Sequence, residues 1–447
     1  MIKSLYRSVP VSILISMIWA NSLLAQPSVA SSEHSSELTP VILIPGTSRT
    51  KLAKKENGKV IWGNFGNFFA MRRSQDELAL PIDSVDLEDN RDDLVPAELM
   101  EEITIIPYLF KMYAYKNFLK RMDEVGGYQL GDIDHPKTGD NFFVFLYDWR
   151  RSNLENAKRL ANRIEELKAF YHKSSMKFDI IAHCSATYMA RYYALYGDKD
   201  VLNEQDPAPT NAGSQNIRKL IFVSPPHRGM AFVFRLIHEG YRPVTLPFIK
   251  AYTPLEFFSS PAFFEMLPTE DEQMFINEYG NPVDVDLYDP HNWVRYGWSV
   301  FSENERGKLE AHLRQKYHDQ WQQEFNREME KRERYLDIAL RHTEAFQRAI
   351  NEKYKTISPD VKLYSIILEG GSTLNLVEFS KNPGELRFDG GPVASLRFVP
   401  GDLMVSHLSM RGRFGENHPE EVYLYGQHRK MANSRDLHVK LLELLSE

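Results

Sequence analysis

The amino-acid sequence predicts an α/β protein in which a mainly parallel β-sheet is flanked by helices and interrupted by a large helical cap insertion. Two observations favour this class. Short apolar runs alternate with helical patterns near both ends of the chain, whereas residues 230 to about 345 contain no convincing strand and many aromatic side chains. The 447 residues, 43% of them hydrophobic, suffice for one large domain with an insertion or for two domains.

The first part of the core contains four short apolar runs bounded by turn residues, which are typical of buried strands. These expected strands are residues 40–44, 142–146, 178–182 and 219–223. Helical spacing follows the second and third runs, over residues 152–171 and from 186 to about 195. Ser152 stands at the position of a helix N-cap.

The strand pattern stops at Pro225-Pro226 and returns near the C-terminus. A charge-dense stretch, residues 304–351, predicts one long helix with a solvated face. Beyond it we expect a strand at 361–368, a hairpin of 384–388 with 394–399 over Asp389-Gly390-Gly391, a strand at 421–425 and a last helix. The predicted division is a signal peptide 1–30, a core segment 31–229, a helical cap 230–349 and a second core segment 350–447.

The first thirty residues have the pattern of an export signal. Lys3 and Arg7 precede a mostly apolar stretch over residues 9–25, and the segments 23–25 and 28–30 each end in a small residue that suits cleavage. The alternative is an uncleaved membrane anchor, for which the stretch is short and interrupted by polar residues. We expect a protein exported to the periplasm or the medium.

Charge and cysteine content exclude several classes of site. The net charge of −7 gives no basic field for nucleic acid. One cysteine excludes an intramolecular disulfide framework and a cysteine-rich zinc site. The sequence contains no phosphate loop, metal-ligand cluster or dinucleotide fingerprint, so we expect neither a cofactor nor a metal.

The segment around Cys184 is the most informative for chemistry. An expected strand runs directly into a helix there, which is the setting of a nucleophile elbow, usually G-x-S-x-G. Ala182 and Ala186 keep the positions two residues away small, and a thiol replaces the hydroxyl. Taking Ser185 as the nucleophile would put His183 and Thr187 at the crowded positions. The alternative interpretation of Cys184 is a small buried hydrophobic residue.

A triad also requires a histidine base and a carboxylate that orients it. Asp402 follows the run ending at residue 401, and His428 follows the expected strand 421–425, both in loops at carboxyl ends of strands. The competing bases are His407 and His438. The alternative acid is Asp389, which also fits a turn-forming role before two glycines.

The oxyanion hole of such a site is built from backbone N–H groups. Ser185, directly after the proposed nucleophile, provides one candidate donor. The loop after the first strand, Pro45-Gly46-Thr47, provides the other, which we assign to Thr47.

Five blocks together resemble the lecithin–cholesterol acyltransferase and phospholipid acyltransferase branch of the α/β-hydrolases. They are the opening strand and oxyanion loop 40–46, the Y-D-W-R block 147–150, the elbow block 179–191, the loop 225–229 and the acid block at 401–402. The blocks occur in the family's order and span most of residues 40–445. The resemblance implies an α/β-hydrolase fold and acyl transfer on a lipid ester.

The chain departs from that pattern at the elbow and in the acid block. Cys184 replaces the family's serine, Ala186 and Thr187 replace its paired glycines, and Leu403 replaces the second glycine of the acid block. These departures support the second hypothesis, a catalytically silent relative that binds a lipid or a partner protein through its cap.

The first hypothesis is an exported lipid acyl hydrolase or O-acyltransferase with a Cys184, His428 and Asp402 triad, which acts at a membrane or lipid surface. By the same resemblance Trp62 would line an acyl pocket. Phe257 and Phe258 belong to a dense aromatic cluster that is either the core of the cap or an apolar funnel for lipid chains.

Overall fold

The computed structural model describes residues 38–63, 76–106, 110–113, 115–241, 252–351, 355–379 and 385–447. The expected signal peptide, residues 1–30, lies outside these residues. No helix in the described ranges has the length and apolar character needed to span a bilayer.

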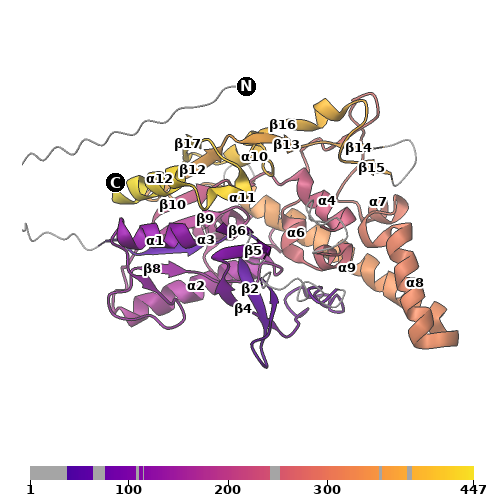
Figure 1. The fold of residues 1–447 in the computed structure, drawn as a ribbon, viewed down its shortest axis with the longest axis horizontal. Coiled ribbons are helices and arrows are strands. Elements are labelled where there is room, and N and C mark those ends of the chain that lie inside the picture. Colours follow the sequence, from indigo (N-terminus) through magenta and orange to yellow (C-terminus); the bar gives the residue numbers. More distant parts are fainter. Residues whose placement is uncertain are drawn as a thin grey trace, which may run out of the picture. The chain divides into compact units, whose positions relative to one another are not determined.

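A seven-stranded parallel sheet forms the centre of the fold, as the sequence predicts. Its order is β17-β12-β10-β9-β1-β8-β7 (Figure 1). The strands are β1 (Val41–Ile44), β7 (Leu130–Gly131), β8 (Phe142–Val144), β9 (Phe178–His183), β10 (Ile217–Val223), β12 (Lys362–Leu368) and β17 (Glu420–Leu424). Every residue of β1 and β9 is buried, which explains their continuous apolar sequence, because helices cover both faces of a parallel sheet.

Two pairs of helices flank this sheet (Figure 1). Helix α2 packs on α3, and α1 packs on α12. Their bounds are α1 Lys116–Glu124, α2 Asn153–Phe170, α3 Ala186–Tyr196 and α12 Arg435–Ser446. The Ser152 hydroxyl accepts the N–H of Leu154 and caps α2, as its position in the sequence indicates.

Among the described residues between β10 and β12, the regular elements are helices apart from the two-residue strand β11 (Phe275–Ile276). Its helices are α4 (Ala231–Glu239), α5 (Pro254–Phe258), α6 (Pro261–Glu265), α7 (Pro290–Arg295), α8 (Glu303–Tyr317) and α9 (Trp321–Asn351). The prediction of a single long helix over residues 304–351 is wrong. The chain breaks at His318, which has φ 48°, and α8 folds back onto α9. The fold-back places the Arg314 guanidinium 3.7 Å from the centre of the Trp321 ring, a contact that one continuous helix cannot make.

The expected hairpin of residues 384–388 with 394–399 is also wrong. Strand β15 (Leu386–Arg387) pairs with β14 (Val377–Phe379), and β16 (Phe398–Gly401) pairs with β13 (Gly371–Leu374). The buried carboxylate of Glu378 explains this pairing, because it binds both Arg387 and Arg397 at 2.6 Å. The turn at Gly390 and Gly391 does form, with positive φ at both residues.

The sequence did not predict the antiparallel strands that follow β1. Strand β2 (Thr50–Lys54) pairs with β3 (Val60–Trp62) and β4 (Leu94–Leu99), and β5 (Glu102–Ile106) pairs with β6 (Phe110–Tyr113). Most of these strands are short and partly polar, so they lack the apolar run that marks the strands of the main sheet.

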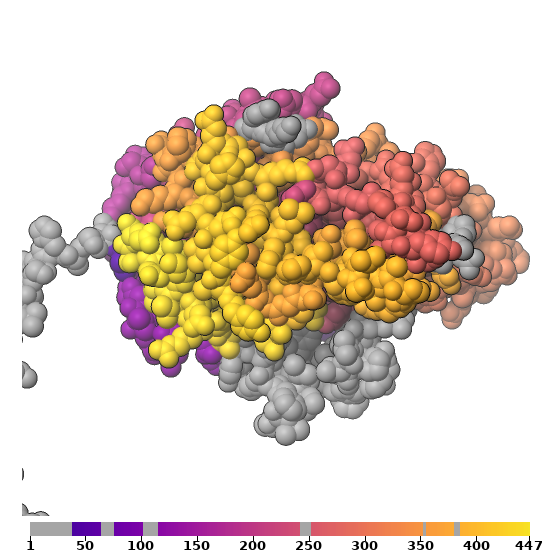
Figure 2. All heavy atoms as spheres, turned by 90° about the horizontal axis from the view of Figure 1, so that it is seen from above, coloured from indigo at the N-terminus to yellow at the C-terminus, as the bar shows by residue number. Residues whose placement is uncertain are grey.

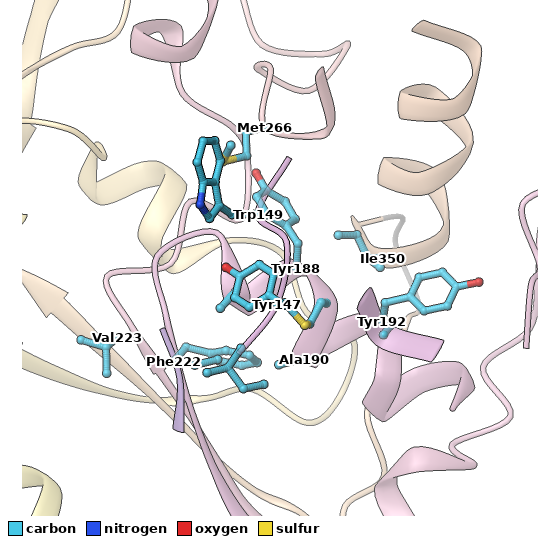
Figure 3. Packing of buried hydrophobic residues seen from close by; sticks show 14 of the residues in the cluster. Tyr147, Trp149, Tyr188, Ala190, Tyr192, Phe222, Val223, Met266 and Ile350 are labelled. Atoms are coloured by element: carbon cyan, nitrogen blue, oxygen red, sulfur yellow. The ribbon is translucent and has the colours of Figure 1, made fainter. Parts of the chain in front are cut away.

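The core continues from the sheet into the helical stretch. Figure 3 shows Tyr147, which follows β8, and Tyr188 of α3 close to Trp149 and Met266. Phe222 and Val223 of β10 lie below them in the same view. The segments from β12 to the C-terminus form much of the face seen in Figure 2.

Candidate active site

Cys184 lies in a strained turn between β9 and α3. Its φ of 57° is in the left-handed region that residues other than glycine seldom adopt. Its N–H donates to the Val223 carbonyl at 2.9 Å. Ala182 and Ala186 are completely buried, so larger side chains have no room beside the turn. This is the strand–turn–helix arrangement of a nucleophile elbow.

Two neighbours of the elbow explain how the unusual sequence fits. The Thr187 hydroxyl donates to the Cys184 carbonyl at 2.7 Å, and the Thr187 N–H donates to the same oxygen at 3.1 Å. A Cβ atom at Gly46 would lie 3.0 Å from the Cys184 Cβ. The loop after β1 therefore reaches the elbow because residue 46 is glycine.

His428 and Asp402 meet at this elbow. The Nδ1 atom of His428 lies 2.7 Å from Oδ2 of Asp402, and the ring interacts electrostatically with Cys184. Burial alone lowers the pKa of His428, but the charges of Asp402 and Cys184 and the hydrogen bonds to both raise it to about 10. The three side chains therefore have the order that a nucleophile, a base and an orienting acid would have.

The competing residues have other partners. His407 lies 3.2 Å from the Leu368 carbonyl through Nε2, and His438 lies 2.9 Å from the Ala432 carbonyl. Asp389 pairs with Arg235 at 2.6 Å and its side chain is 62% exposed. None of these contacts connects His407, His438 or Asp389 to Cys184.

Ser224 is a member of the site that the sequence analysis missed. Its buried hydroxyl donates to Oδ2 of Asp402 and lies 2.9 Å from Nδ1 of His428. The N–H groups of Met404 and Val405 bind the other carboxylate oxygen at 3.0 and 2.7 Å. Burial raises the pKa of Asp402, but the charge of His428 and the hydrogen bonds from His428, Ser224 and the Val405 N–H outweigh that effect and lower the pKa overall. Ser224 directly follows β10, and a serine at that position gives no signal by itself in the sequence.

A second hydrogen-bonded chain supports the loop that follows β1. The Gly46 N–H donates to the Tyr115 hydroxyl at 3.2 Å, and this hydroxyl lies 2.6 Å from Nδ1 of His183. Burial and the charges of His428 and Arg49 hold the pKa of His183 well below its usual value. His183 is therefore neutral, and its ring stacks against His428 with 5.4 Å between the ring centres.

The two predicted oxyanion donors, Thr47 and Ser185, are in direct contact. The Thr47 N–H donates to the Ser185 hydroxyl oxygen at 3.1 Å, and the two side-chain hydroxyls are also hydrogen-bonded. The Tyr147 hydroxyl donates to the Pro45 carbonyl at 2.8 Å in the same loop. In this conformation the Ser185 hydroxyl oxygen therefore accepts the hydrogen bond from the Thr47 N–H that a substrate oxyanion would accept.

No known protein family's sequence profile matches the chain, and no curated protein matches it in sequence. Among solved structures, the Tle4–Tli4 complex contains a chain that aligns with 91% of this chain and 98% of its own length, with 13% identity and a TM-score of 0.54. Phospholipase PlaB from Legionella pneumophila aligns with 35% of this chain and 30% of its own, with 16% identity and a TM-score of 0.22. The first alignment agrees with the seven-stranded parallel sheet. This chain has the α/β-hydrolase fold.

The candidate acid, Asp402, comes from outside the main sheet. We expected Asp402 to follow a strand of that sheet, but β16 pairs with β13 in a separate two-stranded ladder. His428 does follow the edge strand β17, and its N–H donates to the Asp402 carbonyl at 3.0 Å. This backbone bond joins the acid to the base independently of the sheet.

The predicted substrate-contact residues are buried in aromatic packing. Trp62 donates from Nε1 to the Ser48 carbonyl at 2.9 Å and stacks on Tyr252 with 4.7 Å between ring centres. Phe257 lies 4.8 Å from the same Tyr252 ring. Among the described residues, the aromatic neighbours of Phe258 are Phe264, Phe301 and Tyr335 of the helical stretch. Trp62 and Phe257 thus adjoin the loop after β1, whereas Phe258 packs within the helices.

Metal binding finds no support in the described ranges, where no three His, Cys, Asp or Glu side chains are grouped to hold an ion. The site's own polar groups are the thiol, the imidazole, the carboxylate and the backbone donors described above. Acyl transfer through a covalent intermediate requires these groups.

Proposed function

We propose that this chain is an acyl hydrolase or O-acyltransferase that acts on a lipid ester, with Cys184 as nucleophile. One observation carries the proposal: a cysteine held at positive φ after a buried strand interacts with the ring of His428, whose Nδ1 lies 2.7 Å from Oδ2 of Asp402. The raised pKa of His428 makes its imidazole a stronger base towards the neighbouring nucleophile.

In the proposed reaction the Cys184 thiolate attacks the ester carbonyl carbon, and the carbonyl oxygen becomes an oxyanion. The N–H groups of Ser185 and Thr47 hold this oxyanion once the Ser185 hydroxyl has rotated away. The carbon–oxygen bond then breaks, and Nε2 of His428 gives its proton to the departing alcohol. Water or a second alcohol, deprotonated by His428, attacks the thioester and regenerates the thiolate.

The lipid class rests on the motif resemblance and on the surroundings of the site. Cys184 and His428 are 6% and 5% exposed, so the chain must rearrange to admit a substrate. Trp62 at the end of β3 and Phe257 of α5 pack against Tyr252, whose hydroxyl lies 3.0 Å from that of Ser48, next to Thr47. An apolar entrance that opens at a lipid surface fits these features.

Intact-mass measurement tests this proposal. Wild-type protein is incubated with mixed phospholipids and with 4-nitrophenyl butyrate, beside Cys184→Ala and Cys184→Ser variants. We expect an added acyl mass on the wild-type protein and none on the alanine variant, which should not turn over. The serine variant should retain hydrolysis, because the elbow needs a small nucleophile there.

A second candidate is a silent relative that binds a lipid or a protein partner. The contact between the Ser185 hydroxyl and the Thr47 N–H favours it, because this contact fills the oxyanion hole. The silent candidate gains if wild-type protein forms no acyl adduct and Cys184 reacts with iodoacetamide no faster than free cysteine. Equal ester hydrolysis by the alanine variant would remove Cys184 from the mechanism.

Export is a separate part of the proposal and rests on residues 1–30. We expect the mature protein, recovered from outside the cytoplasm, to begin after residue 25 or residue 30. Retention of the intact N-terminus in a membrane fraction would favour the anchor instead.

A further inference from the structure

Two arginines adjoin the proposed catalytic groups without a carboxylate partner. Arg49 lies two residues after Thr47 in the loop that follows β1, and Arg429 directly follows His428 at the start of α11 (His428–Met431). Within the described part of the chain neither guanidinium forms an ion pair, and the Arg49 side chain forms no hydrogen bond. By contrast, the buried guanidinium of Arg150 binds the carboxylates of Asp148 and Asp92.

A continuous set of contacts links these two arginines. Arg429 donates from Nη1 to the Tyr241 hydroxyl at 3.2 Å. The Tyr241 N–H donates to the Tyr252 carbonyl at 3.2 Å, and the Tyr252 hydroxyl lies 3.0 Å from the hydroxyl of Ser48, the neighbour of Arg49. We call Ser48, Arg49, Tyr241, Tyr252 and Arg429 the arginine rim.

The rim's two positive charges act on each other and on the nucleophile. Burial lowers the pKa of Arg49, the Tyr115 hydroxyl and Cys184 oppose that change, and the charge of Arg429 lowers it further. Arg49 is partly buried, and a partly buried charge is stable only when an opposite charge or hydrogen-bond acceptor accompanies it. The chain as a whole is negative, at −7, so the paired positive charges are a local feature.

We propose that Arg49 and Arg429 bind an anionic group of the substrate, a phosphate or carboxylate a few bonds from the scissile ester. Guanidinium groups bind both anions through parallel N–H donors. Arg429 adjoins His428, which protonates the departing alcohol, so the anion belongs to the alcohol half of the ester. This inference rests on the proposed function, because it places the anion beside an ester bound at Cys184.

Soluble short-chain esters test the proposal without a lipid surface. The neutral substrate is dihexanoylglycerol, the phosphate substrate is dihexanoyl phosphatidylglycerol, and the carboxylate substrate is a hexanoyl ester of glyceric acid. Arg49→Gln, Arg429→Gln and the double variant are compared with wild type. Arg163→Gln is the matched control, because Arg163 is a surface residue of α2 paired with Asp134 and Glu166.

We expect each single variant to lower the ratio of anionic to neutral kcat/KM about tenfold, mainly through KM, since a hydrogen bond to a charged group contributes about that factor. Arg49→Lys should recover part of the loss. Selectivity confined to the phosphate ester or to the carboxylate ester identifies which anion is bound.

An unchanged ratio in the double variant would overturn the proposal, as would an equal drop in the Arg163→Gln control. A parallel loss on all three esters, matched by slower alkylation of Cys184 with iodoacetamide, would assign the arginines to the nucleophile and refute the binding role. If wild-type protein hydrolyses none of the esters, the proposed function itself fails. If the variants hydrolyse all three esters with unchanged ratios of anionic to neutral kcat/KM, only the proposed anion-binding role of the arginine rim is refuted.

Discussion

Replacing Ser185 with alanine tests how the oxyanion hole works. In the structure the Ser185 hydroxyl oxygen accepts the Thr47 N–H at 3.1 Å, so a substrate oxyanion must displace it before that donor is available. The Ser185→Ala variant keeps the Ser185 backbone N–H and leaves the Thr47 N–H free. We expect the acylation step to become faster.

The size of the gain follows from one hydrogen bond. Breaking a typical intramolecular hydrogen bond costs about 0.5–1.5 kcal/mol net, which corresponds to a rate change of about two- to tenfold. If the hydroxyl instead donated to the oxyanion, its loss would slow the reaction by about 10²- to 10³-fold, as the removal of other oxyanion donors does. The two roles therefore predict opposite signs.

Pre-steady-state release of 4-nitrophenol from 4-nitrophenyl butyrate measures the acylation step directly. Ser214→Ala is the matched control, because its buried hydroxyl donates to the Ala194 carbonyl at 2.9 Å at the far end of α3. Its burst rate should equal that of wild type. A slower burst in Ser185→Ala, with the control unchanged, would refute the displacement argument.

His428→Ala should lower turnover by several orders of magnitude, since a thiol without a base is mostly protonated at neutral pH. His438→Ala should instead reduce the melting temperature and leave kcat within about twofold. A larger loss of kcat in His438→Ala than in His428→Ala would mean that the base is misassigned. The pKa of His428 rises from 6.5 to about 10 on folding, so its stabilising contribution is complete below about pH 6.5 and is lost as the pH rises towards 10. Urea titrations should show this fall in the free energy of unfolding in wild type and a smaller fall in His428→Asn. Leu403 is 48% exposed and has φ 80°, a strained backbone conformation for a residue other than glycine. Leu403→Gly should therefore raise the free energy of unfolding by about 0.5–1 kcal/mol. Leu403→Ala keeps the backbone strain and should give no gain in stability.

The sequence predicted the sheet well where burial on both faces leaves a continuous apolar run. Strands β1, β9, β10 and β12 lie where such runs occur. The break at His318 was not predictable, because the charges on both sides of it continue the helical pattern and only the packing of α8 against α9 reveals it. The false hairpin has a similar cause, since the buried Glu378 that pairs with Arg387 and Arg397 is a tertiary feature.

The candidate site shows the same division between local and distant information. Cys184, Asp402 and His428 could be proposed because each sits beside a recognisable strand, turn or glycine. Tyr115 could not, because its hydroxyl reaches His183 from 68 positions away in the sequence and nothing near residue 115 indicates that contact. Ser224 stood at the end of a predicted strand, but a serine there carries no signal until the buried carboxylate beside it is known.

The solitary thiol also determines how the site would respond to oxidation. An activated cysteine that meets peroxide forms a sulfenic acid, which a neighbouring cysteine commonly converts to a disulfide. This chain has one cysteine, so no second thiol of its own can trap that oxidised form. Recovery would depend on a reductant from the surroundings, and continued exposure would lead to the irreversible sulfinic acid. The redox state of the compartment would then set the fraction of active molecules.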